Sequence, residues 1–424
     1  MMDYKQLDQL AWQAVFGSDS EKNKAYVTLW NLAQKHGLRP ASINNLYLAR
    51  GRGELPLDFT VPAINLRGMV YDMGRALFQT AVKQKVGALI VELARSEMGY
   101  TAQPPQEYVA VILAAALREN FTGSVFIQGD HFQLKLGDRA GQPKADELDK
   151  VKTLIKDSIN AGFYNIDIDT STLVDYSRKS IEEQQRTNYE LSAQLAQYVR
   201  QIQPAGVTVS LGGEIGHIGG KNSTEAELRA YMEGFKREFV DGAGLSKISI
   251  QTGTHHGGVV LPDGSLAKVA VDFSVLKQLA QVSREYAMGG TVQHGASTLP
   301  DEYFNQFPKS EAIEVHLATG FQNIIMDHPQ FPKQLLTKMY CWLDREKIEE
   351  CKPDQTEEQF HYKLRKKAWG EFKKDCWLLS ERVKQPIRIA LAKRFQFMFE
   401  QLNVVKSQTL INRFVKPAPV KKTA

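Results

Sequence analysis

The chain has 424 residues, of which 43% are hydrophobic and 24% charged, with a net charge of +5. This composition is typical of a soluble globular protein, and the mild charge, without a focused basic patch, argues against nucleic-acid binding. The three cysteines form no CxxC pair, and we find neither a secretion signal nor an apolar run long enough to cross a membrane, so the sequence predicts a cytoplasmic protein.

Residues 1–58 are predicted to form a helical extension. Apolar side chains recur at helical spacing in residues 8–16, 25–37 and 42–51, and Gly37 and Gly51 provide stop signals.

Residues 59–330 show short β-rich runs that alternate with amphipathic helical stretches. The runs are at 61–66, 87–93, 123–130, 164–171, 208–214, 247–253, 290–296 and 323–327. Eight such repeats predict an α/β fold, a (β/α)8 TIM barrel with added N-terminal and C-terminal helices. An open doubly wound sheet is the alternative, but it rarely needs eight parallel units. The segment "EAIEVHLATG", which contains His316, is interpreted as a helix before the last strand.

Residues 331–414 are predicted to form a charged helical extension, and 415–424 have the composition of a disordered tail. The basic run "KLRKKAW" (363–369) is interpreted as a solvated helix face.

Histidines end three of the predicted strands. They are His131, one of the pair His255 and His256, and His294, while Glu214 ends another strand. Strand ends of a barrel converge on the active site, and catalytic zinc takes three protein ligands, commonly imidazoles. The sequence therefore predicts a metal site. Asp130 and His131 can both face it only if the strand has ended there, because adjacent strand residues point to opposite faces.

Five segments, in this order, resemble motifs of the class II, metal-dependent fructose-bisphosphate/tagatose-bisphosphate aldolase family. They are "GDHFQLKL", "INAGFYNIDIDTS", "GGEIGHIGG", "IQTGTHHGG" and "QHGASTLPDE". The resemblance implies that His131, His256 and His294 bind a catalytic Zn²⁺, with Glu214 as an alternative ligand. It assigns Asp130 as the acid/base at the hydroxyl of the bond being broken. The residues that it places at the substrate or its phosphate are Asn65, Gly257, Gly295, Ser297 and Asp327.

Two segments depart from the family pattern. In "GGKNSTEAE" the family's loop acids are replaced, and Glu225 is the candidate that would move the proton at the enediolate carbon. The family's N-x-[DA]-T phosphate motif is matched to "NIIMDHP", where Ile325 and His328 replace Asn and Thr.

The resemblance implies reversible aldol cleavage of a ketose phosphate or related sugar, as in glycolysis. It further implies one catalytic zinc per chain, allows a monovalent cation, and predicts a homo-oligomer, a dimer or larger. Two alternatives stay open. One is a non-catalytic barrel that stabilises a partner enzyme, suggested by the lost loop acids. The other is a metallohydrolase barrel, although such barrels usually begin with an HxH strand, which this chain lacks.

Overall fold

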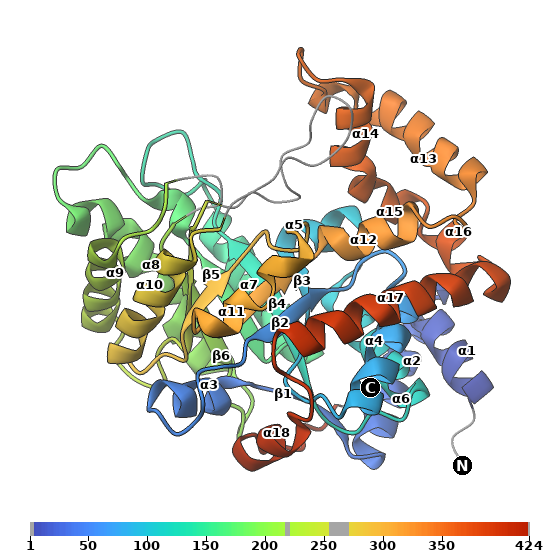
Figure 1. The fold of residues 1–424 in the computed structure, drawn as a ribbon, viewed down its shortest axis with the longest axis horizontal. Coiled ribbons are helices and arrows are strands. Elements are labelled where there is room, and N and C mark those ends of the chain that lie inside the picture. The colour runs from blue at the N-terminus through green and yellow to red at the C-terminus, as the bar shows by residue number, and fades with distance from the viewer. Residues whose placement is uncertain (1–3, 217–220, 254–270, 423–424) are drawn as a thin grey trace.

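The computed structural model describes residues 4–216, 221–253 and 271–422. Within them, eight parallel strands close into the predicted barrel (Figure 1). The barrel strands are β2 (Val61–Asn65), β3 (Ile90–Ala94), β4 (Gly123–Gln133), β5 (Asn165–Asp169), β6 (Ser210–Glu214), β7 (Lys247–Ile250), β8 (Thr291–Gln293) and β9 (Glu314–Leu317). Pairing of β2 with β9 and of β4 with β5 completes the ring.

Helices connect the strands and cover the outside of the barrel. They are α4 (Val70–Gln84), α5 (Arg95–Tyr100), α6 (Pro105–Arg118), α7 (Glu147–Ala161), α8 (Ile181–Ile202), α9 (Glu225–Glu238), α10 (Phe273–Glu285), α11 (Gln306–Lys309) and α12 (Thr319–Met326). Helix α8 begins with a capping box in which Ser180 and Glu183 satisfy each other's backbone N–H groups. None of the helices in the described residues combines the length and apolar character that a membrane crossing requires.

The eighth barrel strand differs from the sequence prediction. Residues 323–326 belong to α12, whereas the strand is β9, in the segment predicted to be helical. The reason is that Glu314 and His316 of β9 are polar yet buried, so the strand lacks an apolar pattern. The apolar residues of α12 instead pack beneath the C-terminal helices, where Phe321 contacts Phe395.

The N-terminal extension contains a strand as well as the predicted helices. Strand β1 (Leu38–Ala41) pairs in parallel with β4, with Leu38 beside Gly123. The extension helices are α1 (Tyr4–Phe16), α2 (Asp19–Lys35) and α3 (Asn44–Gly51). Helices α1 and α2 pack on α6, whose residues 107–117 are all buried between them and the barrel. This burial on all sides explains the continuous apolar sequence of α6.

The C-terminal extension covers part of the barrel's mouth. Its helices are α13 (Lys333–Glu346), α14 (Glu357–Leu364), α15 (Ala368–Glu371), α16 (Lys373–Trp377), α17 (Glu381–Gln401) and α18 (Gln408–Phe414). Helix α15 packs on α5, and α17 packs on α4 and α12 (Figure 1). Trp369 of α15 is fully buried and donates a hydrogen bond to Gln322 at 3.1 Å.

Residues 415–422, for which the sequence predicts a disordered tail, lie against the barrel's outer helices. The Trp30 indole N–H donates to the Val420 carbonyl at 2.8 Å, and the Lys422 ammonium lies 3.9 Å from the Trp30 ring centroid. The tail thus contacts α2, on the first helical hairpin of the chain.

Candidate active site

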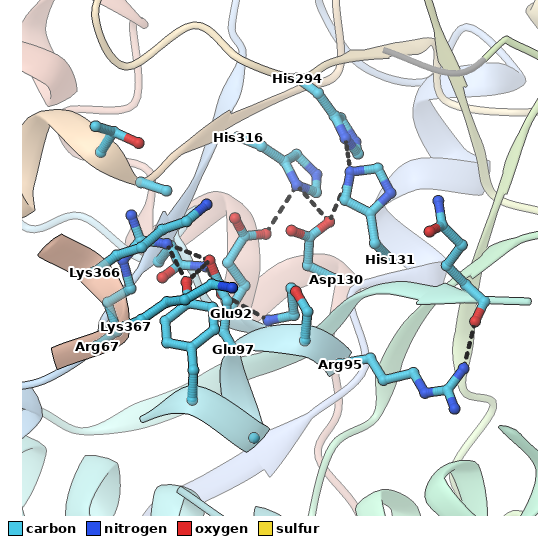
Figure 2. Close-up of a pocket in the computed structure, with 18 of the residues that line it drawn as sticks. Arg67, Glu92, Arg95, Glu97, Asp130, His131, His294, His316, Lys366 and Lys367 are labelled. Carbon is cyan, nitrogen blue, oxygen red and sulfur yellow. Dashed lines mark hydrogen bonds and ion pairs between the residues drawn. The ribbon is translucent and has the colours of Figure 1, made fainter. Parts of the chain in front are cut away.

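A cavity of about 1190 Å³ lies at the C-terminal ends of the barrel strands (Figure 2). Strand-end side chains line its floor, among them Asn65, Glu92 and Asp130. The C-terminal extension contributes Trp342 and Lys366 to its wall. Catalytic residues of TIM-barrel enzymes lie at this same end of the barrel.

Asp130 and His131 both reach the cavity because β4 is bulged at this point. Its register with β5 shifts between Gly129 and Phe132, and His131 has a left-handed backbone conformation with φ of 43°. Gly129 makes room for the bulge, since a Cβ there would lie 2.4 Å from the Phe132 ring. The sequence analysis required the strand to end at this pair, but β4 runs on to Gln133, and it is the bulge that brings both side chains to the cavity.

His131, Glu214 and His294 offer ligand atoms that lie within 4.8 Å of one another. The Nε2 atom of His131 lies 2.5 Å from Nδ1 of His294 (Figure 2), and its Nδ1 lies 3.2 Å from Oε2 of Glu214. Asp169 Oδ2, 3.0 Å from the same Nδ1, is placed as the outer carboxylate that orients a ligand histidine. Two imidazoles and a carboxylate suit Zn²⁺, so the donor set fits a divalent metal. His256, the third predicted histidine, lies outside the described residues.

The charges of these groups depend on one another. Burial opposes a charge on His131, but the Asp130 and Glu214 carboxylates outweigh it and raise the pKa of His131 well above its usual range. Burial, reinforced by Asp169, raises the pKa of Glu214 to about 7. Burial also opposes ionisation of Asp130, yet the imidazoles of His131 and His316 lower the pKa of Asp130 well below its usual range. Asp130 is therefore a carboxylate at neutral pH.

A buried lysine lies beneath this group. The Nζ atom of Lys247 is 2.5 Å from Oε1 of Glu314, 2.9 Å from Oδ1 of Asp167 and 2.7 Å from Oε1 of Gln128. Gly212 leaves space for this arrangement, because a Cβ there would lie 2.4 Å from Asp167. Although burial opposes the charge, the two carboxylates raise the pKa of Lys247. A lysine held as an ammonium cannot attack a carbonyl, so Lys247 does not suit Schiff-base chemistry.

Residues 57–372 match the family model for class II fructose-bisphosphate aldolase. The chain belongs to the class II aldolase family. Membership supports a lyase activity, and the candidate ligand group agrees with the metal dependence typical of class II aldolases. Comparison with curated proteins finds no match.

Solved structures with a similar fold include aldolases. The YdjI aldolase from Escherichia coli K12 has a TM-score of 0.51 and 12% identity, over 86% of this chain and 98% of that chain. A probable tagatose 6 phosphate kinase from Sinorhizobium meliloti 1021 has a TM-score of 0.57 and 14% identity, over 81% and 100%. Fructose-bisphosphate aldolase from Campylobacter jejuni has a TM-score of 0.50 and 16% identity, over 88% and 99%. At these identities the likeness shows the shared fold alone.

Several residues that the class II aldolase resemblance places at the substrate line the cavity. They are Asn65, Gly295 and Ser297. The Ser297 hydroxyl accepts a hydrogen bond from the Gly320 N–H at 3.3 Å. Gly257, like His256, lies outside the described residues.

Glu225 and Asp327 are not brought to the cavity with the other predicted class II aldolase residues. Glu225 is half-buried at the start of α9, where it accepts a hydrogen bond from Arg229 at 2.8 Å. Asp327 ends α12 with its side chain 54% exposed and pairs with Arg365 at 2.5 Å. Its assignment depended on the misplaced eighth strand, so the correction of that strand removes it from the cavity.

His316 is a cavity residue that the sequence prediction missed. It lies on β9 and not in a helix, with Nδ1 3.0 Å from Oε2 of Glu92 and 3.2 Å from Oδ1 of Asp130. The sequence around His316 contains a motif that could have located this residue. Residues 316–319 read H-L-A-T, which resembles the class II aldolase N-x-[DA]-T motif with His316 in place of Asn. Thr319 also lines the cavity, so the motif belongs here and not at 325–328.

The basic run 363–369 is also placed differently from its prediction as a solvated face. Lys366 and Lys367 line the cavity, and Arg365 is buried. The folded position of the extension, which the sequence pattern does not report, turns part of this run towards the class II aldolase site.

Proposed function

We propose that the protein is a zinc-dependent aldolase that reversibly cleaves a ketose phosphate. The observation that carries the proposal is the convergence of His131, His294 and Glu214 beside the ionised Asp130. When bound to these ligands, a divalent cation supplies a Lewis acid for the negative charge that develops on the substrate oxygens.

Asp130 is assigned the proton transfer at the substrate hydroxyl. Its Oδ1 lies 3.8 Å from Nε2 of His131 and 3.2 Å from Nδ1 of His316, so the carboxylate stands beside the candidate metal ligands. The depressed pKa of Asp130 keeps it ionised, so that it is unprotonated when the substrate hydroxyl is bound. In the cleavage direction it takes the hydroxyl proton, and in synthesis it returns that proton to the new hydroxyl.

The substrate phosphate is assigned to the ends of β8 and β9. Gly295 has φ of 69°, a conformation suited to glycine, and Ser297 lies two residues further on. Thr319 is the first residue of α12, and backbone N–H groups at a helix N-terminus favour an anion. These groups support a phosphorylated substrate.

Metal analysis combined with aldol cleavage tests the proposal. After zinc loading and desalting, the protein should retain about one zinc per chain, as a catalytic site requires. It should cleave at least one member of a panel of ketose 1-phosphates and 1,6-bisphosphates, lose the activity with a chelator and regain it with zinc.

Matched variants sharpen this test. His294→Ala and His256→Ala should lose the zinc, whereas His255→Ala, the adjacent control, should keep it. A purified protein without stoichiometric metal, or one fully active in excess chelator, would contradict the proposal.

A further inference from the structure

Reversible aldol cleavage moves two protons, and Asp130 accounts for one of them. It takes the proton of the substrate hydroxyl, whereas the enediolate that cleavage leaves behind must gain a proton at carbon. Glu225, the residue that the sequence predicts for this second transfer, lies outside the cavity. Another acid in the cavity must therefore supply the second proton.

Five carboxyl groups line the cavity in the part of the chain that the structure describes, namely Glu92, Glu97, Asp130, Glu214 and Glu371. Asp130 already serves as the base, and Glu214 belongs to the candidate metal ligands. Glu97 is held by an ion pair with Arg67 and a hydrogen bond from Asn65. Glu371 is exposed on α15. Glu92 is the carboxyl group that remains.

Glu92 lies on β3, which pairs with β4, and Figure 2 shows the carboxyl groups of Glu92 and Asp130 next to the His316 imidazole. Oε2 of Glu92 lies 3.0 Å from Nδ1 of His316 and accepts a hydrogen bond from Gln128 at 3.3 Å. Oδ1 of Asp130 lies 3.2 Å from the same His316 nitrogen. The Tyr108 hydroxyl donates to the Glu92 carbonyl at 2.6 Å, which fixes the backbone here. Two carboxyl groups from neighbouring strands are thus held at one point of the cavity.

The surroundings of Glu92 and Asp130 favour opposite protonation states. Burial raises the pKa of Glu92 to about 8, an effect that His316 only partly opposes and the Asp130 charge reinforces. Despite its burial, Asp130 has a pKa well below its usual range because of His131 and His316. At neutral pH a carboxylic acid that can donate a proton therefore stands beside a carboxylate that can accept one. Separated pKa values of this kind are typical of paired acid and base groups in active sites.

We propose that Glu92 is the catalytic acid that adds the proton to the enediolate carbon, while Asp130 acts at the substrate hydroxyl. The inference rests on the proposed aldolase function. In cleavage, Asp130 takes the hydroxyl proton, the aldehyde leaves, and the electron pair of the broken carbon–carbon bond forms the enediolate. The Glu92 O–H then supplies the proton of the new C–H bond, and the ketone is restored. Glu92 is left as a carboxylate and Asp130 as an acid, and the transfer of one proton through solvent returns both to their starting states.

Exchange of the donor's hydrogen with deuterated water tests Glu92 without an aldehyde. Zinc-loaded protein is mixed with dihydroxyacetone phosphate, and proton NMR follows the loss of the carbon-bound hydrogen. Glu92→Gln should exchange about 10²–10⁴-fold more slowly, the usual contribution of an acid/base group, with unchanged zinc content. Glu371→Gln, the same substitution at an exposed carboxyl group of the cavity, should exchange at the unchanged rate.

A second assay separates a catalytic role from a merely structural one. During cleavage of a ketose phosphate, hexacyanoferrate(III) removes two electrons from each enediolate and so reports cleavage without the protonation step. In Glu92→Gln, ordinary turnover should fall about 10²–10⁴-fold, while hexacyanoferrate(III) reduction stays within about tenfold of the unchanged protein. Asp130→Asn should lose both, because it blocks cleavage itself. Glu92→Asp, which keeps the acid, should recover at least about tenfold of the exchange rate lost in Glu92→Gln.

The inference is overturned if Glu92→Gln exchanges at the unchanged rate, or if it loses hexacyanoferrate(III) reduction together with exchange. Equal losses in Glu92→Gln and Glu92→Asp would overturn it as well. Failure of the aldolase function has a different result, because the unchanged zinc-loaded protein would then neither cleave a ketose phosphate nor exchange the donor's hydrogen.

Discussion

Replacement of Lys247 by methionine should destabilise the barrel by about 3 kcal/mol. Burial alone would raise the pKa of Glu314, but Lys247 and His316 outweigh burial and lower it from 4.5 to about 2. The shift belongs to Lys247 and His316 together, and removal of Lys247 leaves the buried Glu314 carboxylate without its ammonium partner. Breaking a buried ion pair by removing one partner typically costs about 3–5 kcal/mol, and the lower end is expected here because His316 still faces Glu314.

The pH dependence has a defined sign. A carboxylate with a depressed folded-state pKa stabilises the protein above its unfolded value, and that contribution is lost as the pH falls from 4.5 towards 2. The difference between Lys247→Met and the unchanged protein should therefore be largest at neutral pH and shrink on acidification. Equilibrium urea denaturation followed by circular dichroism measures this difference.

The double variant Lys247→Met/Glu314→Gln is the control. It removes the orphaned charge together with its partner, while burial already raises the pKa of Asp167, which can take up a proton. Most of the lost stability should return. The reasoning is refuted if the single variant loses less than about 1 kcal/mol, or if the double variant is no more stable than the single one.

Three further predictions concern the site. Asp130→Asn should keep its zinc but lose about 10²–10⁴-fold in cleavage rate, the usual contribution of an acid/base group; a loss below tenfold would assign the proton transfer elsewhere. Glu225→Gln should change kcat/KM by less than about twofold, because Glu225 lies outside the cavity and a partly exposed ion pair contributes little; a much larger effect would make Glu225 a catalytic candidate again. Zinc affinity, measured by competition with a chromogenic chelator, should increase from pH 5 to 8, because the raised pKa of His131 makes protons compete with metal. A flat profile would exclude His131 as a ligand.

The sequence predicts the barrel well where strands follow an apolar pattern. Seven of the eight predicted runs, from 61–66 to 290–296, overlap a barrel strand of the structure. The eighth fails because β9 directs Glu314 and His316 into a polar interior, where Lys247 satisfies the charge of Glu314. Periodicity cannot report a polar strand of this kind, since the compensating partner lies on another strand.

The candidate ligands His131, Glu214 and His294 are predictable because strand ends converge in any barrel. The position of Lys366 in the cavity wall cannot be predicted from the sequence, because it depends on how α15 packs against α5, which lies far from it along the chain. The bulge at Gly129 cannot be predicted from the pattern of strand residues either, yet it brings Asp130 and His131 to the cavity together.

The backbone conformation of His131 brings its imidazole to the site but lowers the stability of the fold. A left-handed conformation costs a residue other than glycine about 1–2 kcal/mol. With φ of 43°, the position suits glycine better than histidine. We expect His131→Gly to relieve this strain while it abolishes metal binding. At this one position the backbone conformation that serves the candidate metal site therefore lowers the stability of the barrel, and the stability gained by His131→Gly measures that cost.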